Sequence, residues 1–92
     1  MVRIEGIIWL DSIVEKIEHK HHVSIEEVEE VLSGTPRVRY VERGHRRGEN
    51  VYSAVGRTAG GRRLIVFFVY KPRTKEALPL SARAPGRRER NL

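Results

Sequence analysis

The segment 64–70 (LIVFFVY) constrains the fold most, because seven largely apolar residues follow one another without a charged side chain. A strand with such an unbroken run is expected at the centre of a sheet with both faces covered. Gly60 and Gly61 stand shortly before it and readily adopt the positive φ angles that a tight hairpin needs. The sequence therefore predicts a hairpin of strands 51–58 and 63–71 in the middle of a sheet.

Two short antiparallel helices are predicted ahead of these strands, over 11–21 and 24–34. Each begins with a capping box, formed by Ser12 with Glu15 and by Ser24 with Glu27. Gly34 provides a C-terminal stop for the second helix. His21 follows Ile17 by four residues, so its side chain is expected to point toward the sheet. There it is either a satisfied histidine at the edge of the core or part of a site.

Strand patterns also cover 2–10, 37–42 and 76–83, and residues 84–92 are expected to form a short C-terminal helix or an irregular tail. The resulting order, β-α-α-β-β-β-β, predicts a single α+β domain over 1–92. Two N-terminal helices should pack on one face of a mostly antiparallel sheet of four to five strands.

Side-chain alternation brings one arginine to the end of each of two predicted strands. Strict alternation groups Arg57 with Val51, Ser53 and Val55, and groups Arg83 with Ala77, Pro79 and Ser81. Because Pro79 cannot donate a ladder hydrogen bond, an edge position or a bulge is expected there. Arg57 and Arg83 are then either rim residues whose stems cover the core, or a pair that binds a phosphate.

Charge is divided unevenly along the chain. Residues 1–34 hold 3 basic and 8 acidic side chains, a net charge of −5, whereas residues 35–92 hold 15 basic and 4 acidic ones, a net charge of +11. Most of the basic residues are arginines, whose planar fork of donors matches phosphate oxygens. This pattern favours a polyanionic partner, above all nucleic acid, over an ordinary solvated arginine-rich surface.

Composition argues against several other classes of protein. The absence of cysteine excludes disulfides and thiolate zinc sites. No apolar run approaches the roughly 20 residues that span a bilayer, and no signal peptide is recognisable, so an intracellular soluble domain is expected. The sequence lacks the G-x-S-x-G elbow of serine hydrolases and any glycine-rich phosphate loop. The histidines of the segment 19–22 (HKHH) do not share one helix face, so neither a metal nor another cofactor is expected.

Three segments resemble, in order and spacing, the BrnT family, the toxin half of BrnT–BrnA toxin–antitoxin pairs. They are KHHVSIEEVEEVL (20–32), GRTAGGRRLIVFFVY (56–70) and SARAPGRRER (81–90). Trp9 fits the opening of the family pattern, so the resemblance covers roughly 9–90. His22 stands where the family has glycine.

The resemblance implies a RelE-like fold and a cytoplasmic, metal-free endoribonuclease that slows translation until a BrnA-like antitoxin blocks it in a hetero-oligomer. RNA carries its own nucleophile, the 2′-hydroxyl, so such an enzyme needs only proton-transfer groups and cations. His21 or Glu89 would transfer protons, while Arg57 and Arg83 would stabilise charge on the phosphate. By position in the family motifs, the catalytic candidates are His21, Arg57, Arg83, Glu89 and Arg90.

Further basic residues and one aromatic residue are expected to bind RNA, with Tyr70 stacking on a base. These candidates are Lys20, Arg62, Arg63, Tyr70, Arg87 and Arg88. The alternative from another class is a non-catalytic module that binds nucleic acid or a protein partner, as a degenerate toxin would.

Overall fold

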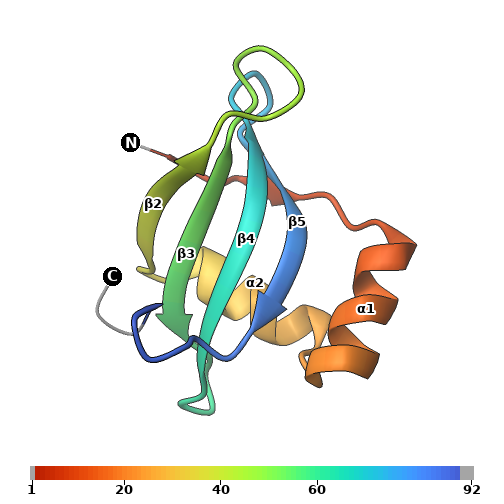
Figure 1. Ribbon diagram of the computed structural model, residues 1–92, viewed down its shortest axis with the longest axis vertical. Helices are drawn as coiled ribbons and strands as arrows, with labels where there is room; N and C mark the ends of the chain where they lie inside the picture. Colours follow the sequence, from red (N-terminus) through yellow and green to blue (C-terminus); the bar gives the residue numbers. More distant parts are fainter. Residues whose placement is uncertain (1, 90–92) are drawn as a thin grey trace.

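The computed structural model describes residues 2–89. Along the chain it contains β1 (Gly6–Ile7), α1 (Asp11–His21), α2 (Ile25–Ser33), β2 (Arg37–Glu42), β3 (Val51–Arg57), β4 (Arg63–Lys71) and β5 (Glu76–Arg83). The strands form one sheet in the order β1-β5-β4-β3-β2 (Figure 1). β1 is parallel to β5, and the other neighbours are antiparallel. The predicted α+β class, with two helices ahead of a mostly antiparallel sheet, is confirmed.

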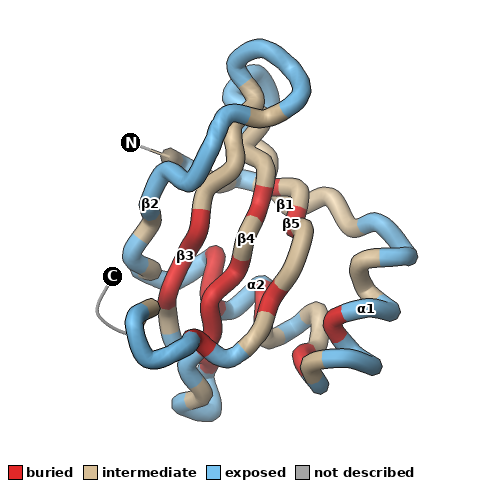
Figure 2. Tube along the Cα trace, viewed as in Figure 1, coloured by how far each residue is buried: buried red, intermediate tan, exposed pale blue. Residues whose placement is uncertain are grey.

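β4 lies at the centre of the sheet, as its unbroken apolar run predicts. On the face covered by the helices its alternate residues are fully buried, namely Leu64, Val66 and Phe68. On the other face Ile65 is buried, but Phe67 and Val69 are only half-buried. The expectation that both faces are covered is therefore wrong for part of the strand. No helix of residues 2–89 covers this second face. The segment after β5 crosses it at the end of the sheet that carries the β3–β4 turn (Figures 1 and 2).

The two helices start differently. α2 has the predicted capping box, because Ser24 Oγ accepts the Glu27 amide at 3.1 Å and Glu27 Oε1 accepts the Ser24 amide at 3.1 Å. The predicted box in α1 is wrong, since its N-cap is Leu10 and no side chain caps the helix there. Instead, the Leu10 carbonyl accepts the amide of Val14 at 3.0 Å.

The helices do not form the predicted antiparallel pair. α1 packs beside β5, whereas α2 packs against β3 and β4 and crosses behind them (Figure 1). The chain turns sharply between the helices at His22, which adopts a left-handed conformation (φ 54°, ψ 42°). Each helix thus covers a different part of the sheet. No helix in the described part of the chain is long and apolar enough to cross a membrane.

The N-terminal strand is much shorter than the predicted 2–10. Its pairing with β5 covers Gly6–Ile7, and the amides of Glu5 and Ile8 donate to Lys75 and Ala77 on either side. The apolar residues around it, Val2, Ile4, Ile7 and Trp9, pack against the core without continuous pairing. An apolar sequence pattern indicates that side chains are buried. Around β1 these side chains are buried by packing against the core and not by continuous strand pairing.

Candidate functional site

A β-bulge in β5 decides which face of the sheet carries Arg83. Phe68 pairs with Pro79 and Phe67 pairs with Ser81, so Leu80 is an extra residue in the strand. The expectation of an edge position or a bulge at Pro79 is confirmed as a bulge. However, strict alternation along β5 is wrong, because the extra residue reverses the side-chain order.

The reversal separates residues that alternation had grouped together. Ala77 and Pro79 are buried on the helix-covered face, opposite Tyr70 and Phe68. Ser81 and Arg83 lie on the opposite face, which we call the open face. Because Val55 pairs with Ile65 and Ile65 pairs with Arg83, Arg57 shares this face with Arg83.

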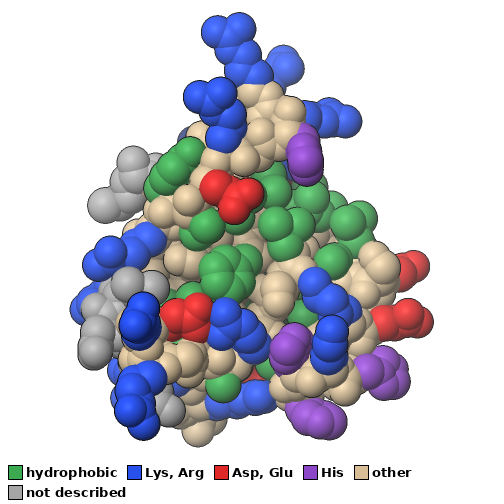
Figure 3. All heavy atoms as spheres, viewed as in Figure 1, with side chains coloured by type: hydrophobic (Ala, Val, Ile, Leu, Met, Phe, Trp, Pro, Cys, Tyr) green, Lys and Arg blue, Asp and Glu red, His purple; other side chains and the backbone are tan. Residues whose placement is uncertain are grey.

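The open face has an apolar centre and a basic border (Figure 3). One row of cross-strand neighbours runs from Arg39 through Ser53 and Phe67 to Ser81. At the end of the hairpin, Arg57 pairs with Arg63, which places two like charges directly opposite each other. Such a pair is unfavourable without a counterion, so an anion near it is stabilising. The segment after β5 crosses this end of the sheet (Figure 1) and carries two exposed arginines. We call the basic residues of this end the arginine cluster: Arg57, Arg63, Arg83, Arg87 and Arg88.

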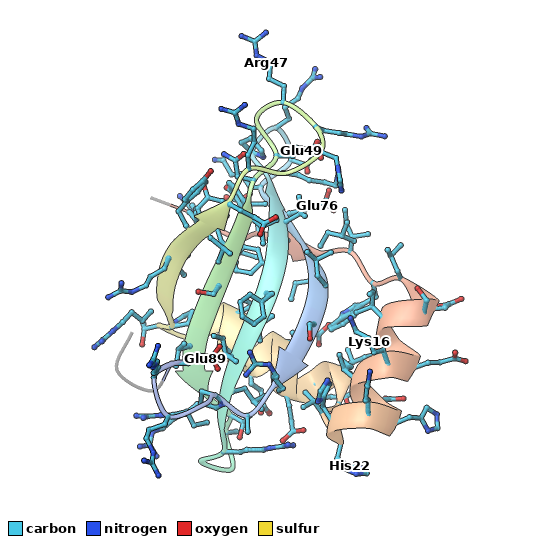
Figure 4. All side chains as sticks on the ribbon, viewed as in Figure 1. Lys16, His22, Arg47, Glu49, Glu76 and Glu89 are labelled. Carbon is cyan, nitrogen blue, oxygen red and sulfur yellow. The ribbon has the colours of Figure 1, made fainter. Side chains whose placement is uncertain are left out.

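Arg83 is held by a two-point ion pair with Glu89. Nη1 donates to Oε1 at 2.7 Å and Nη2 donates to Oε2 at 2.8 Å, the parallel geometry of strong guanidinium–carboxylate pairs. Glu89 Oε1 also accepts the Gly86 amide at 2.7 Å, which closes the turn after β5 (Figure 4). The guanidinium lies over the Phe67 ring, 5.5 Å from its centroid.

These contacts determine the charge state of Glu89. Hydrogen bonds from the Arg83 guanidinium and from the Gly86 amide lower the pKa of Glu89 from 4.5 to about 2. The same pair raises the pKa of Arg83. At neutral pH Glu89 is therefore an anion with little tendency to accept a proton, and in this structure it holds Arg83 in place.

His21 is the last residue of α1 and is half-buried. Its backbone carbonyl accepts Arg62 Nη2 at 3.2 Å, and the His22 carbonyl accepts Arg62 Nη1 at 2.7 Å. Arg62 also pairs with Glu27 at 3.2 Å. The guanidinium thus binds the C-terminal carbonyls of α1 and a side chain of α2, an arrangement that the helix dipole favours.

Arg62, an expected RNA-binding residue, is therefore engaged within the fold. Tyr70, the expected stacking residue, lies on the helix-covered face, because it pairs with the buried Ala77. Its hydroxyl donates to the Arg3 carbonyl at 2.6 Å, and its ring packs edge-on against Tyr52. The aromatic residue beside Arg83 is Phe67, which sequence reasoning missed. Alternation with Ile65 along β4 was the pattern that could have found it.

The remaining candidates divide between two places. Arg57, Arg63, Arg87 and Arg88 are exposed in the arginine cluster, and Lys20 is exposed on α1. Arg90 lies outside the described residues. Within residues 2–89, no group of three His, Asp or Glu side chains is arranged to hold a metal ion. Compared with models of known protein families and with curated proteins, the chain gives no match.

Proposed function

We propose that this protein is a metal-independent endoribonuclease toxin of the BrnT type, with a RelE-like fold. The observation that carries the proposal is the bulge in β5, which brings Arg83 to the same face as Arg57 and beside exposed arginines. The sequence resemblance to BrnT toxins, described above, supports the same reading. A BrnA-like antitoxin would cover the basic surface, in the cytoplasm, and block the inhibition of translation.

The chemistry follows from what RNA supplies. The 2′-hydroxyl loses its proton and attacks the adjacent phosphorus, the bond to the 5′-oxygen breaks, and that oxygen takes up a proton. Arg57 and Arg83 stabilise the negative charge that builds on the non-bridging oxygens. His21 is the candidate for proton transfer, because histidine is the side chain that most often acts as a general acid or base. Glu89 acts as a positioning residue, because its low pKa suits it to hold Arg83 rather than to accept a proton.

The test is cleavage of end-labelled single-stranded RNA by the purified chain in the presence of EDTA. We expect shortened products with 5′-hydroxyl ends from the wild type. Arg83→Ala should lower the cleavage rate by about 100-fold or more, the order of effect of removing one charge-stabilising donor. Full activity of a folded Arg83→Ala variant would contradict the assignment.

A second candidate function is a non-catalytic module that binds RNA or a protein partner. It is favoured by the closed ion pair between Arg83 and Glu89, which neutralises the cation that catalysis needs. The same experiment separates the two, because a binding module retards RNA on a gel without shortening it. Binding without cleavage, by the wild type at any EDTA concentration, would favour this second function.

A further inference from the structure

A second group of basic residues lies at the end of the sheet opposite the arginine cluster. We call it the apex, and it consists of the loop 43–50 between β2 and β3 together with the turn 72–75 between β4 and β5. Both segments lie at the same end, because the strands alternate in direction (Figure 1). Arginines project from it, and Figure 4 shows Arg47 at the outermost tip. The exposed arginines of the apex are Arg43, Arg46, Arg47 and Arg73.

The arginines of the apex keep their positive charge unopposed. The acidic side chain of the loop, Glu49, pairs with Lys71 at 2.9 Å and so links the two hairpins. Glu5 pairs with Arg3 at 3.2 Å and lies 3.9 Å from Lys75. Among residues 2–89, no carboxylate is within ion-pair distance of the four exposed arginines. The apex is therefore a positively charged surface that an external anion would neutralise.

The loop has a defined shape. The Arg46 carbonyl accepts the Glu49 amide at 3.0 Å, and Gly48 adopts φ +83°, which closes a turn. A Cβ at Gly44 would collide with the Glu49 carbonyl, so the backbone crosses itself closely there. The result is a hollow lined by Arg43, Gly44, His45, Arg47, Gly48 and Asn50.

We propose that the apex binds the phosphate backbone of single-stranded RNA, as a second binding surface remote from the arginine cluster. The choice of RNA rests on the proposed function. A protein partner fits less well, because the centre of a protein interface is usually built from aromatic and apolar side chains. The lining of this hollow has none. Arginine forks around a glycine-bordered hollow match phosphate oxygens instead.

The position of the apex sets a length requirement on the RNA. The Cα trace extends 33 Å along its longest axis, and the apex occupies one end of that axis (Figure 2). A trinucleotide bound at the arginine cluster is too short to reach it, whereas a chain of about 15 nucleotides reaches both, since each nucleotide adds at least roughly 3.4 Å. RNA length therefore separates binding at one of the two surfaces from binding that spans both.

The test compares a 3-nucleotide and a 15-nucleotide 2′-O-methyl RNA, which bind without being cleaved, by fluorescence anisotropy. The variant Arg43→Gln/Arg46→Gln/Arg47→Gln should bind the longer RNA on the order of tenfold more weakly than the wild type does. Its affinity for the trinucleotide should fall much less, because the arginine cluster still binds that short RNA. The slope of log affinity against log salt should become shallower by about 0.7 for each phosphate that the variant no longer neutralises.

Two controls accompany this comparison. The triple variant with lysine at the same three positions retains the charge and should retain most of the binding. The single variant Arg47→Gln, at the loop tip, gives a smaller loss in the same direction, which removes any doubt about folding of the triple variant. If the glutamine triple variant bound the 15-nucleotide RNA as tightly as the wild type does, the proposal would be overturned. Equal affinity of the wild type for polyglutamate, with the same loss in the variant, would also overturn it in favour of an acidic protein.

The outcome is independent of whether the protein cleaves RNA. If the wild type does not shorten unmodified RNA, the proposed function fails. A selective loss of 15-nucleotide binding in the triple variant would still establish the apex as a nucleic-acid-binding surface. If cleavage occurs and the triple variant binds normally, the proposed function stands without the apex.

Discussion

Lys16 Nζ donates a hydrogen bond to the carbonyl oxygen of Leu80 at 2.6 Å, across 64 residues of sequence. Leu80 is the extra residue of the β5 bulge, whose backbone groups leave the regular ladder. The hydrogen bond therefore fixes α1 against β5 at the position where the side-chain order reverses. A lysine of the first helix thus supports the backbone geometry that turns Arg83 toward the open face.

Replacing Lys16 by methionine should destabilise the protein by about 1 kcal/mol, because the Leu80 carbonyl loses its donor while the aliphatic stem is kept. Urea unfolding followed by circular dichroism measures the difference. The matched control is Lys20→Met on the same helix, expected within about 0.5 kcal/mol of the wild type. Equal effects of the two substitutions would show that the hydrogen bond to Leu80 contributes nothing specific.

Arg62→Met should destabilise the fold by about 2 kcal/mol, because the guanidinium binds the carbonyls of His21 and His22 together with Glu27. The matched control is Arg63→Met at the neighbouring exposed position, which removes the same charge and should have little effect on stability. Thermal and urea unfolding of both variants give the comparison. A smaller loss of stability for Arg62→Met than for Arg63→Met would contradict the role of Arg62 in joining the two helices.

The lowered pKa of Glu89 predicts that the free energy of unfolding depends on pH in the acid range. Because its pKa is lowered from 4.5 to about 2, it stabilises the folded state above about pH 4.5. That contribution is lost as the pH falls from 4.5 toward 2. The variant Glu89→Gln lacks the titration, so the wild type should be more stable at pH 6, and the gap should shrink by pH 2. A gap that stays constant over urea titrations between pH 6 and pH 2 would be inconsistent with the ion pair.

His22→Gly should stabilise the protein by about 1 kcal/mol, because His22 holds a left-handed conformation at the end of α1 that glycine adopts without steric cost. The same change at His19, inside the helix, should destabilise by about 0.5 kcal/mol, because glycine has a lower helix propensity than histidine. Differential scanning calorimetry of the two variants should show shifts of opposite sign in the melting temperature. Destabilisation by His22→Gly would mean that its side chain contributes more than the strain costs.

Much of the candidate site was predictable from sequence. The arginine-rich second part of the chain and the two arginines at strand ends could be identified, because net charge and residue identity are independent of folding. The partners of each arginine could not. Arg62 and Arg63 are adjacent and chemically identical, yet the first binds helix ends 35 to 41 residues away in sequence and the second is exposed. Only three-dimensional proximity distinguishes them.

The sequence by itself determined where most helices and strands lie and that β4 is central, because periods of 3.6 and 2 residues record which side chains become buried. The tertiary structure decided the face of Arg83, the partners of Arg62 and the face of Tyr70. The physical reason is that the alternation of a strand holds only until a bulge interrupts it. The bulge at Leu80 lies where β5 pairs with the preceding strand β4 and where Lys16, 64 residues away in sequence, donates a hydrogen bond to the Leu80 carbonyl.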